Sequence, residues 1–275
     1  MADTGVMHKV IVITGASDGI GAEMARQWAA RDKGSVALVL AARSTDKLEA
    51  VAASCRAGGA QVLVQRCDVG SQADCVALVA AAAQTFGRID TLVNNAGMSA
   101  QALFEDVADL AWYEELMRIN HWGSVWCTHA ALPHLKAARG RIVAVSSLAG
   151  LVGVPGRTAY SGTKFAMTGF FEALRVELAA SGVSVTLAYP GVVATQIRYR
   201  GFNAQGAAAG RSGLDERGAM SVEECARLIV QGAEARRRDI VMTARGKLGR
   251  WLKLFAPGAV DRLALKALKQ EARPK

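Results

Sequence analysis

The sequence has few of the residues that build disulfide frameworks and metal sites. Its five cysteines are odd in number and form no CxxC pair, so we expect reduced thiols packed in the interior. His121, His129 and His134 fall in an expected helical region without clustered cysteine or carboxylate partners, which predicts structural or surface roles. The composition therefore argues against a disulfide-stapled module and predicts no metal.

The chain also lacks an apolar leader and an even spread of charge. Residues 1–8 are too short and too polar for a signal peptide or membrane anchor, so we expect a cytoplasmic protein. Of the net charge of +9, the stretch from Arg245 onward carries +7, from nine basic and two acidic residues, and the rest is nearly neutral. Nucleic-acid binding needs stacking groups among the basic ones, and this stretch has only Trp251 and Phe255. We therefore expect no nucleic-acid partner.

The length of 275 residues suits one α/β domain, and its most informative stretch lies near the middle. Residues 140–145 are a short apolar run of strand length, which places Ser147 at the carboxyl end of a strand. After a turn rich in glycine and proline, the 3.6-residue period predicts a helix over 158–180. Tyr160 and Lys164, four residues apart, then share one face of that helix.

A phenol beside an ammonium suits chemistry at an alcohol or carbonyl oxygen. A free phenol titrates near ~10, and a cation one helical turn away favours the phenolate and lowers that pKa. Ser147 can donate a hydrogen bond to the same substrate oxygen. Tyr160 and Lys164 also fit an ordinary amphipathic helix, because a YxxxK pair is common by chance, so a second motif has to decide.

A glycine-rich turn near the amino terminus is that second motif. Residues 9–13 form an expected buried strand and residues 22–31 an expected helix, and the sequence TGASDGIG between them contains Gly15, Gly19 and Gly21. Such a turn lets the backbone approach a pyrophosphate at the positive end of the helix. A bare turn from strand to helix is the alternative.

Three further segments complete a pattern that resembles the classical short-chain dehydrogenases/reductases over residues 9–242. The glycine turn is similar to that family's TGxxxGxG, residues 94–97 match its NNAG, residues 190–195 match its PGxVxT, and Asn120 stands at its catalytic asparagine position. The resemblance implies an α/β fold: a single-domain Rossmann-type doubly wound parallel sheet of about seven strands with helices on both faces. Residues 1–244 would form this dinucleotide-binding and catalytic domain.

The resemblance also implies the roles of individual residues. Tyr160 would be the acid/base, Ser147 would orient the substrate oxygen, Lys164 would hold the nicotinamide ribose and lower the tyrosine pKa, and Asn120 would anchor a water in a proton relay. The cofactor-binding positions that it implies are Gly15, Ser17, Asp18, Gly19, Ile20, Gly21, Arg43, Ser44, Asp68, Val69, Asn94, Ala96, Gly97, Tyr160, Lys164, Pro190, Gly191, Val193 and Thr195.

The end of the second strand, expected over residues 35–40, indicates which dinucleotide is used. An acidic residue there would bind the ribose 2′-hydroxyl of NAD, whereas Arg43 and Ser44 suit the 2′-phosphate of NADP. Asp18 in the glycine turn argues weakly the other way, and a solvated loop charge is the alternative for Arg43. We expect NADP(H) to be favoured over NAD(H).

Helices and strands are expected to alternate through the chain, at 46–57, 61–66, 71–86 and 89–93, and again at 183–188, 222–235 and 239–242. Asp68 follows the third strand, where the family flanks the adenine ring, although it also suits a helix cap. The helical region 112–135 has an apolar face that the family uses for a homodimer or homotetramer. Trp122 and Trp126, spaced i,i+4, fit either that contact or the core.

The segment 197–218 has no regular pattern and is rich in glycine and alanine. Ile197, Tyr199 and Phe202 within it are predicted to close over a substrate as a lid, with a surface insertion as the alternative. Their apolar character predicts an apolar alcohol or carbonyl substrate.

The extension 245–275 predicts two short amphipathic helices separated at Pro257. Leu248, Trp251, Leu252 and Phe255 fall on one side of the first, and basic residues fall on the other. We expect the apolar side to pack on the same domain or a neighbouring subunit and to complete the active-site wall. Contact of these helices with an anionic membrane is the alternative.

Two classes of function fit the motifs: an NAD(P)-dependent oxidoreductase, and a catalytically idle protein that keeps the dinucleotide as a ligand. The complete set of Asn120, Ser147, Tyr160 and Lys164 favours the enzyme, because an idle relative has no physical need for all four. A membrane-associated reductase of lipid-like or steroid-like carbonyls is the further alternative.

Overall fold

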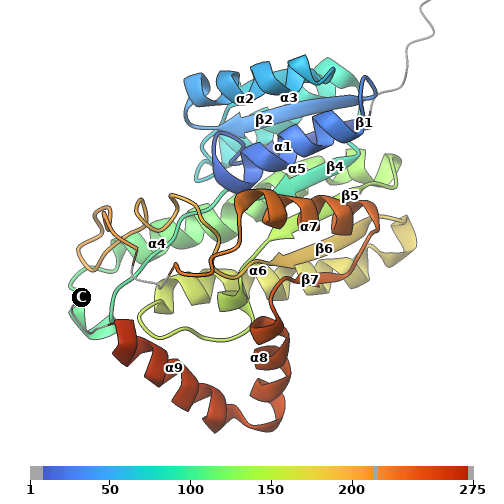
Figure 1. The fold of residues 1–275 in the computed structure, drawn as a ribbon. Coiled ribbons are helices and arrows are strands. Elements are labelled where there is room, and N and C mark those ends of the chain that lie inside the picture. The colour runs from blue at the N-terminus through green and yellow to red at the C-terminus, as the bar shows by residue number, and fades with distance from the viewer. Residues whose placement is uncertain (1–8, 213–215, 272–275) are drawn as a thin grey trace, which may run out of the picture.

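A computed structural model describes residues 9–212 and 216–271, and its centre is one parallel sheet in the order β3-β2-β1-β4-β5-β6-β7 (Figure 1). The strands are β1 (Lys9–Thr14), β2 (Val36–Ala42), β3 (Gln61–Arg66), β4 (Thr91–Asn94), β5 (Arg141–Val145), β6 (Ser184–Tyr189) and β7 (Asp239–Val241). Because β1 pairs with both β2 and β4, the strand order reverses there, and the carboxyl ends of these strands border the crevice where such folds bind ligands. The predicted doubly wound sheet of about seven strands is confirmed.

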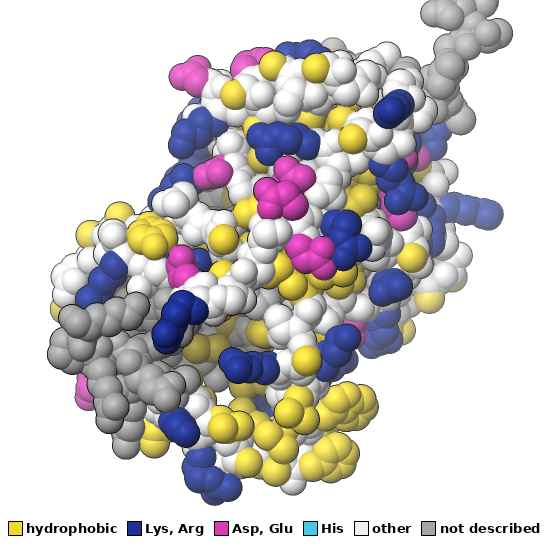
Figure 2. All heavy atoms as spheres, in the orientation of Figure 1, with side chains coloured by type: hydrophobic (Ala, Val, Ile, Leu, Met, Phe, Trp, Pro, Cys, Tyr) yellow, Lys and Arg dark blue, Asp and Glu magenta, His cyan; other side chains and the backbone are white. Residues whose placement is uncertain are grey.

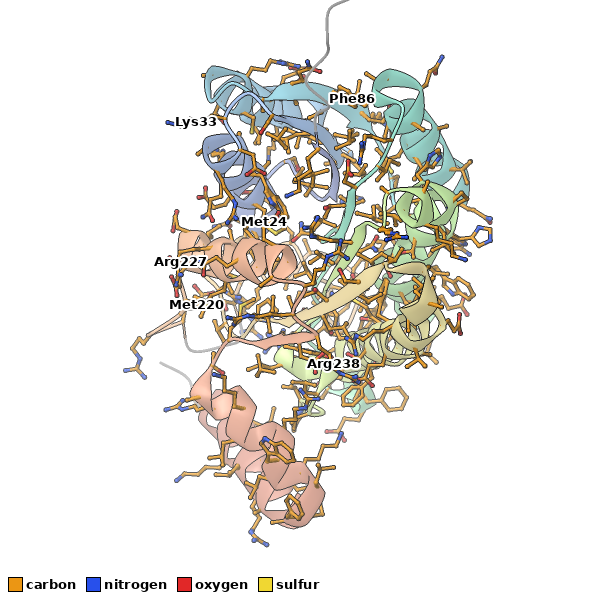
Figure 3. All side chains as sticks on the ribbon, turned by 90° about the vertical axis from the view of Figure 1, so that its right-hand side faces the viewer. Met24, Lys33, Phe86, Met220, Arg227 and Arg238 are labelled. Atoms are coloured by element: carbon orange, nitrogen blue, oxygen red, sulfur yellow. The ribbon has the colours of Figure 1, made fainter. Side chains whose placement is uncertain are left out.

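Helices cover both faces of the sheet. They are α1 (Gly19–Arg31), α2 (Thr45–Ala57), α3 (Gln72–Phe86), α4 (Ala111–Met117), α5 (Gly123–Ala137), α6 (Thr158–Glu177), α7 (Val222–Glu234), α8 (Ala244–Phe255) and α9 (Pro257–Glu271). The α1, α2 and α7 helices bury apolar side chains against one face, and α3, α5 and α6 against the other. Figure 3 shows α1 and α7 side by side, with α8 and α9 beyond them at one end of the molecule.

The strands fill both cores because successive side chains point to opposite faces. Ile11 and Ile13 of β1 lie in the core under α1 and α7, and Val10 and Val12 lie in the core under α3 and α5. All four are buried. The near-continuous apolar runs in the sequence are thus the mark of a sheet covered on both sides.

Several element bounds differ from those expected. The α1 helix begins at Gly19, three residues early, because the Asp18 carboxylate accepts a hydrogen bond from the Gly19 N–H at 2.7 Å and caps the helix. At its other end, α6 stops at Glu177 and passes through a 3₁₀ turn to Gly182, whose φ of +74° ends the helical path. The β2 strand continues to Ala42, which brings Arg43 directly to the sheet edge.

The predicted lid residues lie in different environments. Ile197 lines the cavity described below, and Phe202 is buried against Trp112, with ring centroids 5.7 Å apart. The backbone of Phe202 also donates to Ser99 O and accepts from Gln101 N. Tyr199 is not among the residues that line this cavity. Phe202 therefore anchors the segment to the domain in this structure, and closure of the segment over a substrate stays a prediction.

The two helices expected in the extension are present, but the first faces the other way. The chain between them turns at Ala256, and Pro257 is the first residue of α9, where proline needs no N–H partner. Leu248, Trp251 and Phe255 are exposed by 64%, 60% and 80%. Among the described side chains of the extension, none lines the cavity, so the extension adds nothing to the active-site wall of its own chain. Packing of the apolar side on a neighbouring subunit stays a prediction.

Across residues 9–212 and 216–271, no helix has the length and apolar character needed to cross a membrane.

Candidate active site

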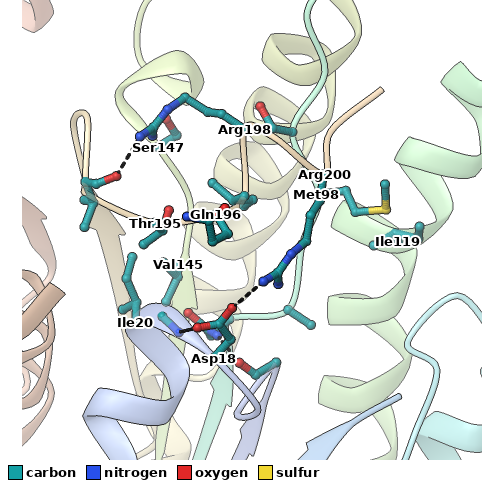
Figure 4. Close-up of a pocket in the computed structure, with 18 of the residues that line it drawn as sticks. Asp18, Ile20, Met98, Ile119, Val145, Ser147, Thr195, Gln196, Arg198 and Arg200 are labelled. Atoms are coloured by element: carbon teal, nitrogen blue, oxygen red, sulfur yellow. Dashed lines mark hydrogen bonds and ion pairs between the residues drawn. The ribbon is translucent and has the colours of Figure 1, made fainter. Parts of the chain in front are cut away.

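A cavity of about 480 Å³ lies at the carboxyl ends of β1, β2, β4, β5 and β6 (Figure 4). Most of the predicted site residues line it, namely Gly15, Ser17, Asp18, Gly19, Ile20, Arg43, Ser44, Asp68, Val69, Ala96, Gly97, Ser147, Tyr160, Lys164, Pro190, Gly191, Val193 and Thr195. Gly21, Asn94 and Asn120 are the predicted residues that do not line it. The structure therefore brings the amino-terminal and central motifs to one place.

The glycine turn is packed so tightly that side chains are excluded. A Cβ on Gly15, whose φ is +66°, would lie 2.8 Å from Ala96 Cα, and one on Gly21 would lie 2.3 Å from Gly15 O. Thr14 Oγ1 accepts hydrogen bonds from the N–H groups of Asn95 and Ala96, both at 3.1 Å. This cradle of bare backbone at the N-terminus of α1 fits a pyrophosphate group. Gly21 contributes to this cradle because its missing side chain allows α1 to lie close to the turn.

An ion pair crosses the cavity beside this turn. Arg200, from the segment after β6, donates to the Asp18 carboxylate at 2.7 Å (Figure 4). Partial burial alone would raise the pKa of Asp18, but the Arg200 guanidinium and the Gly19 N–H hold that pKa below its usual range. The Asp18 charge is thus balanced by a residue that the motifs did not indicate.

The end of the cavity beyond β2 is lined by Arg43, Ser44, Lys47 and Asp68. Lys47 was missed by the sequence reasoning, although its place four residues after Arg43, in the first turn of α2, is a signal that could have found it. Asp68 Oδ1 accepts from the Gly70 N–H at 2.9 Å, and the cap of α3 is Ser71, which accepts from the Asp74 N–H. The alternative that Asp68 caps a helix is therefore wrong.

Ser147, Tyr160 and Lys164 meet at the other end. Ser147 follows β5, its Oγ accepts from the Ala149 N–H at 3.2 Å, and its hydroxyl hydrogen-bonds the Tyr160 phenol. Lys164 Nζ lies 5.8 Å from the Tyr160 ring centroid and donates to the Val145 carbonyl at 2.9 Å. Phenol, hydroxyl and amine thus converge on the cavity, as the i,i+4 spacing predicted.

Burial dominates the titration of this pair. It raises the pKa of Tyr160 above its ordinary value, while the Ser147 hydrogen bond and the charges of Arg157 and Arg198 pull that pKa down. It lowers the pKa of Lys164 to about 8. The expectation that Lys164 brings the tyrosine pKa below its usual range is therefore not met in this structure, because the ammonium is directed to Val145 O.

Asn120 lies behind the cavity wall in a single π-helical turn, η2 (Arg118–Trp122), between α4 and α5. Its Oδ1 accepts from the Met98 N–H at 2.8 Å, and its Nδ2 donates to Met98 O and Thr163 Oγ1. A Cβ on Gly97 would lie 3.0 Å from Asn120 Oδ1 and 3.7 Å from Lys164 Nζ. The side chain of Asn120 thus fixes the strand end beside Lys164, and π turns are frequent where a helix must place such a group.

Two buried arginines near Tyr160 were also missed. Arg157 donates to Ser99 Oγ at 3.1 Å and to Gln101 Oε1 at 3.2 Å, and Arg198 pairs with Glu216 at 2.7 Å. Both line the cavity. The i,i+3 spacing of Arg157 and Tyr160 was an available signal.

The chain is similar to known proteins in both sequence and structure. The family model for "short chain dehydrogenase" matches residues 9–205. The chain is 38% identical over 266 residues to "11-beta-hydroxysteroid dehydrogenase A" of Sesamum indicum, across 93% of this chain and 74% of that protein. It is 43% identical over 189 residues to "11-beta-hydroxysteroid dehydrogenase-like 4A" of Arabidopsis thaliana, and this match spans 68% of the chain but only 62% of that relative's length.

Solved structures of the same fold carry dinucleotides. A short-chain dehydrogenase/reductase from Burkholderia phymatum in complex with NAD is 25% identical, with a TM-score of 0.79 over 92% of this chain and 95% of that one. An alcohol dehydrogenase from the archaeon Thermococcus sibiricus, complexed with 5-hydroxy-NADP, is 25% identical, with a TM-score of 0.73 over 85% of this chain and 94% of that one. With its family motifs gathered around one cavity and these relatives in sequence and fold, the chain belongs to the short-chain dehydrogenase/reductase family of oxidoreductases.

Proposed function

We propose that the protein is an NADP(H)-preferring oxidoreductase that interconverts an apolar alcohol and its carbonyl compound. The observation that carries this proposal is the meeting of Ser147, Tyr160 and Lys164 at one end of a cavity that also contains the closely packed glycine turn. The names of the relatives support a steroid-like or lipid-like substrate. The bound dinucleotide would supply or accept the hydride.

The protein's own groups would handle the substrate oxygen and its proton. Ser147 donates a hydrogen bond that stabilises negative charge on that oxygen, and Tyr160 gives or takes the proton. Lys164, buried with its pKa lowered to about 8, can lose a proton at modest cost and so serve the relay behind Tyr160. Asn120 positions the Met98 backbone next to Lys164, and we propose that it holds the water which continues this relay.

The preference for NADP(H) rests on three side chains at the adenosine end. Arg43 and Lys47 are cationic, Ser44 provides a hydroxyl, and all three line the cavity beyond β2. A guanidinium, an ammonium and a hydroxyl together match the charge and the acceptors of a 2′-phosphate.

We further propose that two or four copies associate through the outer faces of α5 and α6. Trp122 is 47% exposed and stacks on Trp126 at 6.0 Å, and Val176 on α6 is 71% exposed. Large exposed apolar groups on neighbouring helices are typical of subunit contacts. All five cysteines are buried free thiols, which supports a reducing compartment, and we propose the cytoplasm.

A screen of NADPH and NADH oxidation against aldehydes, ketones, quinones and sterols tests the activity. We expect turnover with at least one apolar carbonyl compound and a lower KM for NADPH than for NADH. If calorimetry shows tight dinucleotide binding while no substrate is turned over, the idle dinucleotide-binding protein becomes the better account. A lower KM for NADH than for NADPH would contradict the proposed cofactor preference but not the proposed reaction.

A further inference from the structure

The corner formed by α8 and α9 has an apolar surface that nothing in the described chain covers. Its residues are Leu248, Trp251, Leu254, Phe255, Leu263 and Leu265, which we call the apolar corner. Each is about half exposed or more, and Phe255 is 80% exposed. Figure 2 shows hydrophobic side chains gathered at this end of the molecule. Leu248, Trp251, Leu254 and Phe255 share one side of α8, and exposed apolar side chains gathered in this way mark a contact site.

The inner face of α8 explains why the apolar side points outward. Gly246 is so close to the domain that a Cβ would lie 2.3 Å from Leu148 Cδ2. Arg250 pairs with Asp239 at 2.9 Å, and Lys253 donates to Leu151 O at 3.1 Å, with its ammonium 4.5 Å from the Phe165 ring centroid. Rolling the helix to bury Trp251 would break both polar contacts and open the close approach at Gly246.

We propose that the apolar corner lies in the interface of an anionic lipid bilayer. Exposed Arg245, Lys247, Arg262 and Lys266 belong to the same two helices, and the stretch from Arg245 onward carries a net charge of +7. Anionic headgroups attract basic side chains while leucine, tryptophan and phenylalanine enter the boundary of the acyl chains. Trp251 suits this position because its ring is apolar and its N–H is polar.

Charge decides between a bilayer and a second copy of the chain. A two-fold contact through the apolar corner would bring two stretches of +7 together, and their repulsion would oppose the association. A surface rich in phosphatidylserine supplies the opposite charge over the whole corner. The proposal concerns where the protein binds and does not depend on its substrate.

Flotation of the full chain with phosphatidylcholine vesicles, with and without phosphatidylserine, tests the proposal. We expect binding only to the anionic vesicles and release at high salt. Trp251→Ser and Phe255→Ser should each weaken vesicle partitioning by about tenfold or more, because each removes a large apolar side chain from the interface. Val76→Ser, on α3 at the far end of the molecule, is the matched control and should bind like the unaltered chain.

Sedimentation of the Trp251→Ser/Phe255→Ser variant, together with circular dichroism, completes the test. We expect the double variant to keep the oligomeric mass of the unaltered protein and to stay folded, since both side chains are exposed. The proposal is overturned if the unaltered chain does not float with anionic vesicles, or if the folded double variant floats equally well. A double variant of lower oligomeric mass would instead make the apolar corner a subunit contact and would also overturn it.

Discussion

Replacing Lys164 by methionine should make the protein more stable and catalytically inert. Lys164 is 4% exposed, and burial lowers its pKa from 10.5 to about 8. The unfolded chain therefore holds this proton more tightly than the folded one, and each pKa unit is worth about 1.4 kcal/mol, so at pH 7 the buried charge costs about 3 kcal/mol. Loss of the hydrogen bond from Nζ to Val145 O offsets about 1 kcal/mol.

The net gain for Lys164→Met is about 2 kcal/mol at pH 7, or about 5 °C in Tm for a chain of this size. The sign follows from linkage: between about pH 8 and 10.5 the unfolded chain keeps a proton that the folded chain has lost, so the unaltered protein gains stability as pH rises. The advantage of Lys164→Met should therefore shrink over that window and vanish above it.

Differential scanning calorimetry without added cofactor, from pH 7 to pH 10.5, measures this difference, since bound dinucleotide would add its own stabilisation. Lys136→Met on α5 is the control, because Lys136 is exposed, and its Tm should change little at any pH. A lower Tm for Lys164→Met at pH 7, or a difference that does not depend on pH, would refute the reasoning.

Four further outcomes are expected. Tyr160→Phe should keep the fold and cofactor binding but lower kcat by about 10² to 10⁴-fold, the usual effect of a lost acid/base, and a near-normal rate would rule out the assigned role. Arg43→Ala should raise the KM for NADPH much more than that for NADH; equal effects would mean that the 2′-phosphate is bound elsewhere. Arg200→Gln should leave Tm nearly unchanged, because the ion pair with Asp18 is about half exposed, but it should weaken dinucleotide binding measured by calorimetry. The double variant Asp18→Asn/Arg200→Gln should recover this binding. If it does not, Arg200 acts independently of Asp18. Gly21→Ala should lower both Tm and cofactor affinity, since its Cβ meets Gly15 O, whereas Gly169→Ala, with open space around it, should lower neither; similar behaviour of the two variants would contradict the close approach.

Features with a local cause were predicted well from the sequence. The period of α6 fixes that Tyr160 and Lys164 share a face, and glycine spacing after β1 fixes the turn, because both follow from backbone geometry within a few residues. The pKa of Tyr160 was not predictable in this way. It depends on how deeply the phenol is buried and where the Lys164 ammonium points, and both are set by tertiary packing.

The orientation of α8 was predicted wrongly for a similar reason. A hydrophobic period shows which side chains of α8 lie together, but not which side meets the domain. Here the side of α8 that carries Gly246 and Arg250 faces the domain. Gly246 lies close against Leu148, and Arg250 pairs with the carboxylate of Asp239. The π turn at Asn120 also escapes prediction, because it spans only Arg118–Trp122, which is too short a stretch to show a period of its own.

The loop between β5 and α6 links the proposed catalytic residues to the extension. Ser147 stands before this loop and Tyr160 after it, while Leu148, Leu151 and residue 156 within it meet Gly246, Lys253 and Leu268 of the extension. The extension and the loop therefore form one structural unit. In chimaeras between relatives, an exchanged extension should function only when its loop 148–157 is exchanged with it, because each is shaped to the other.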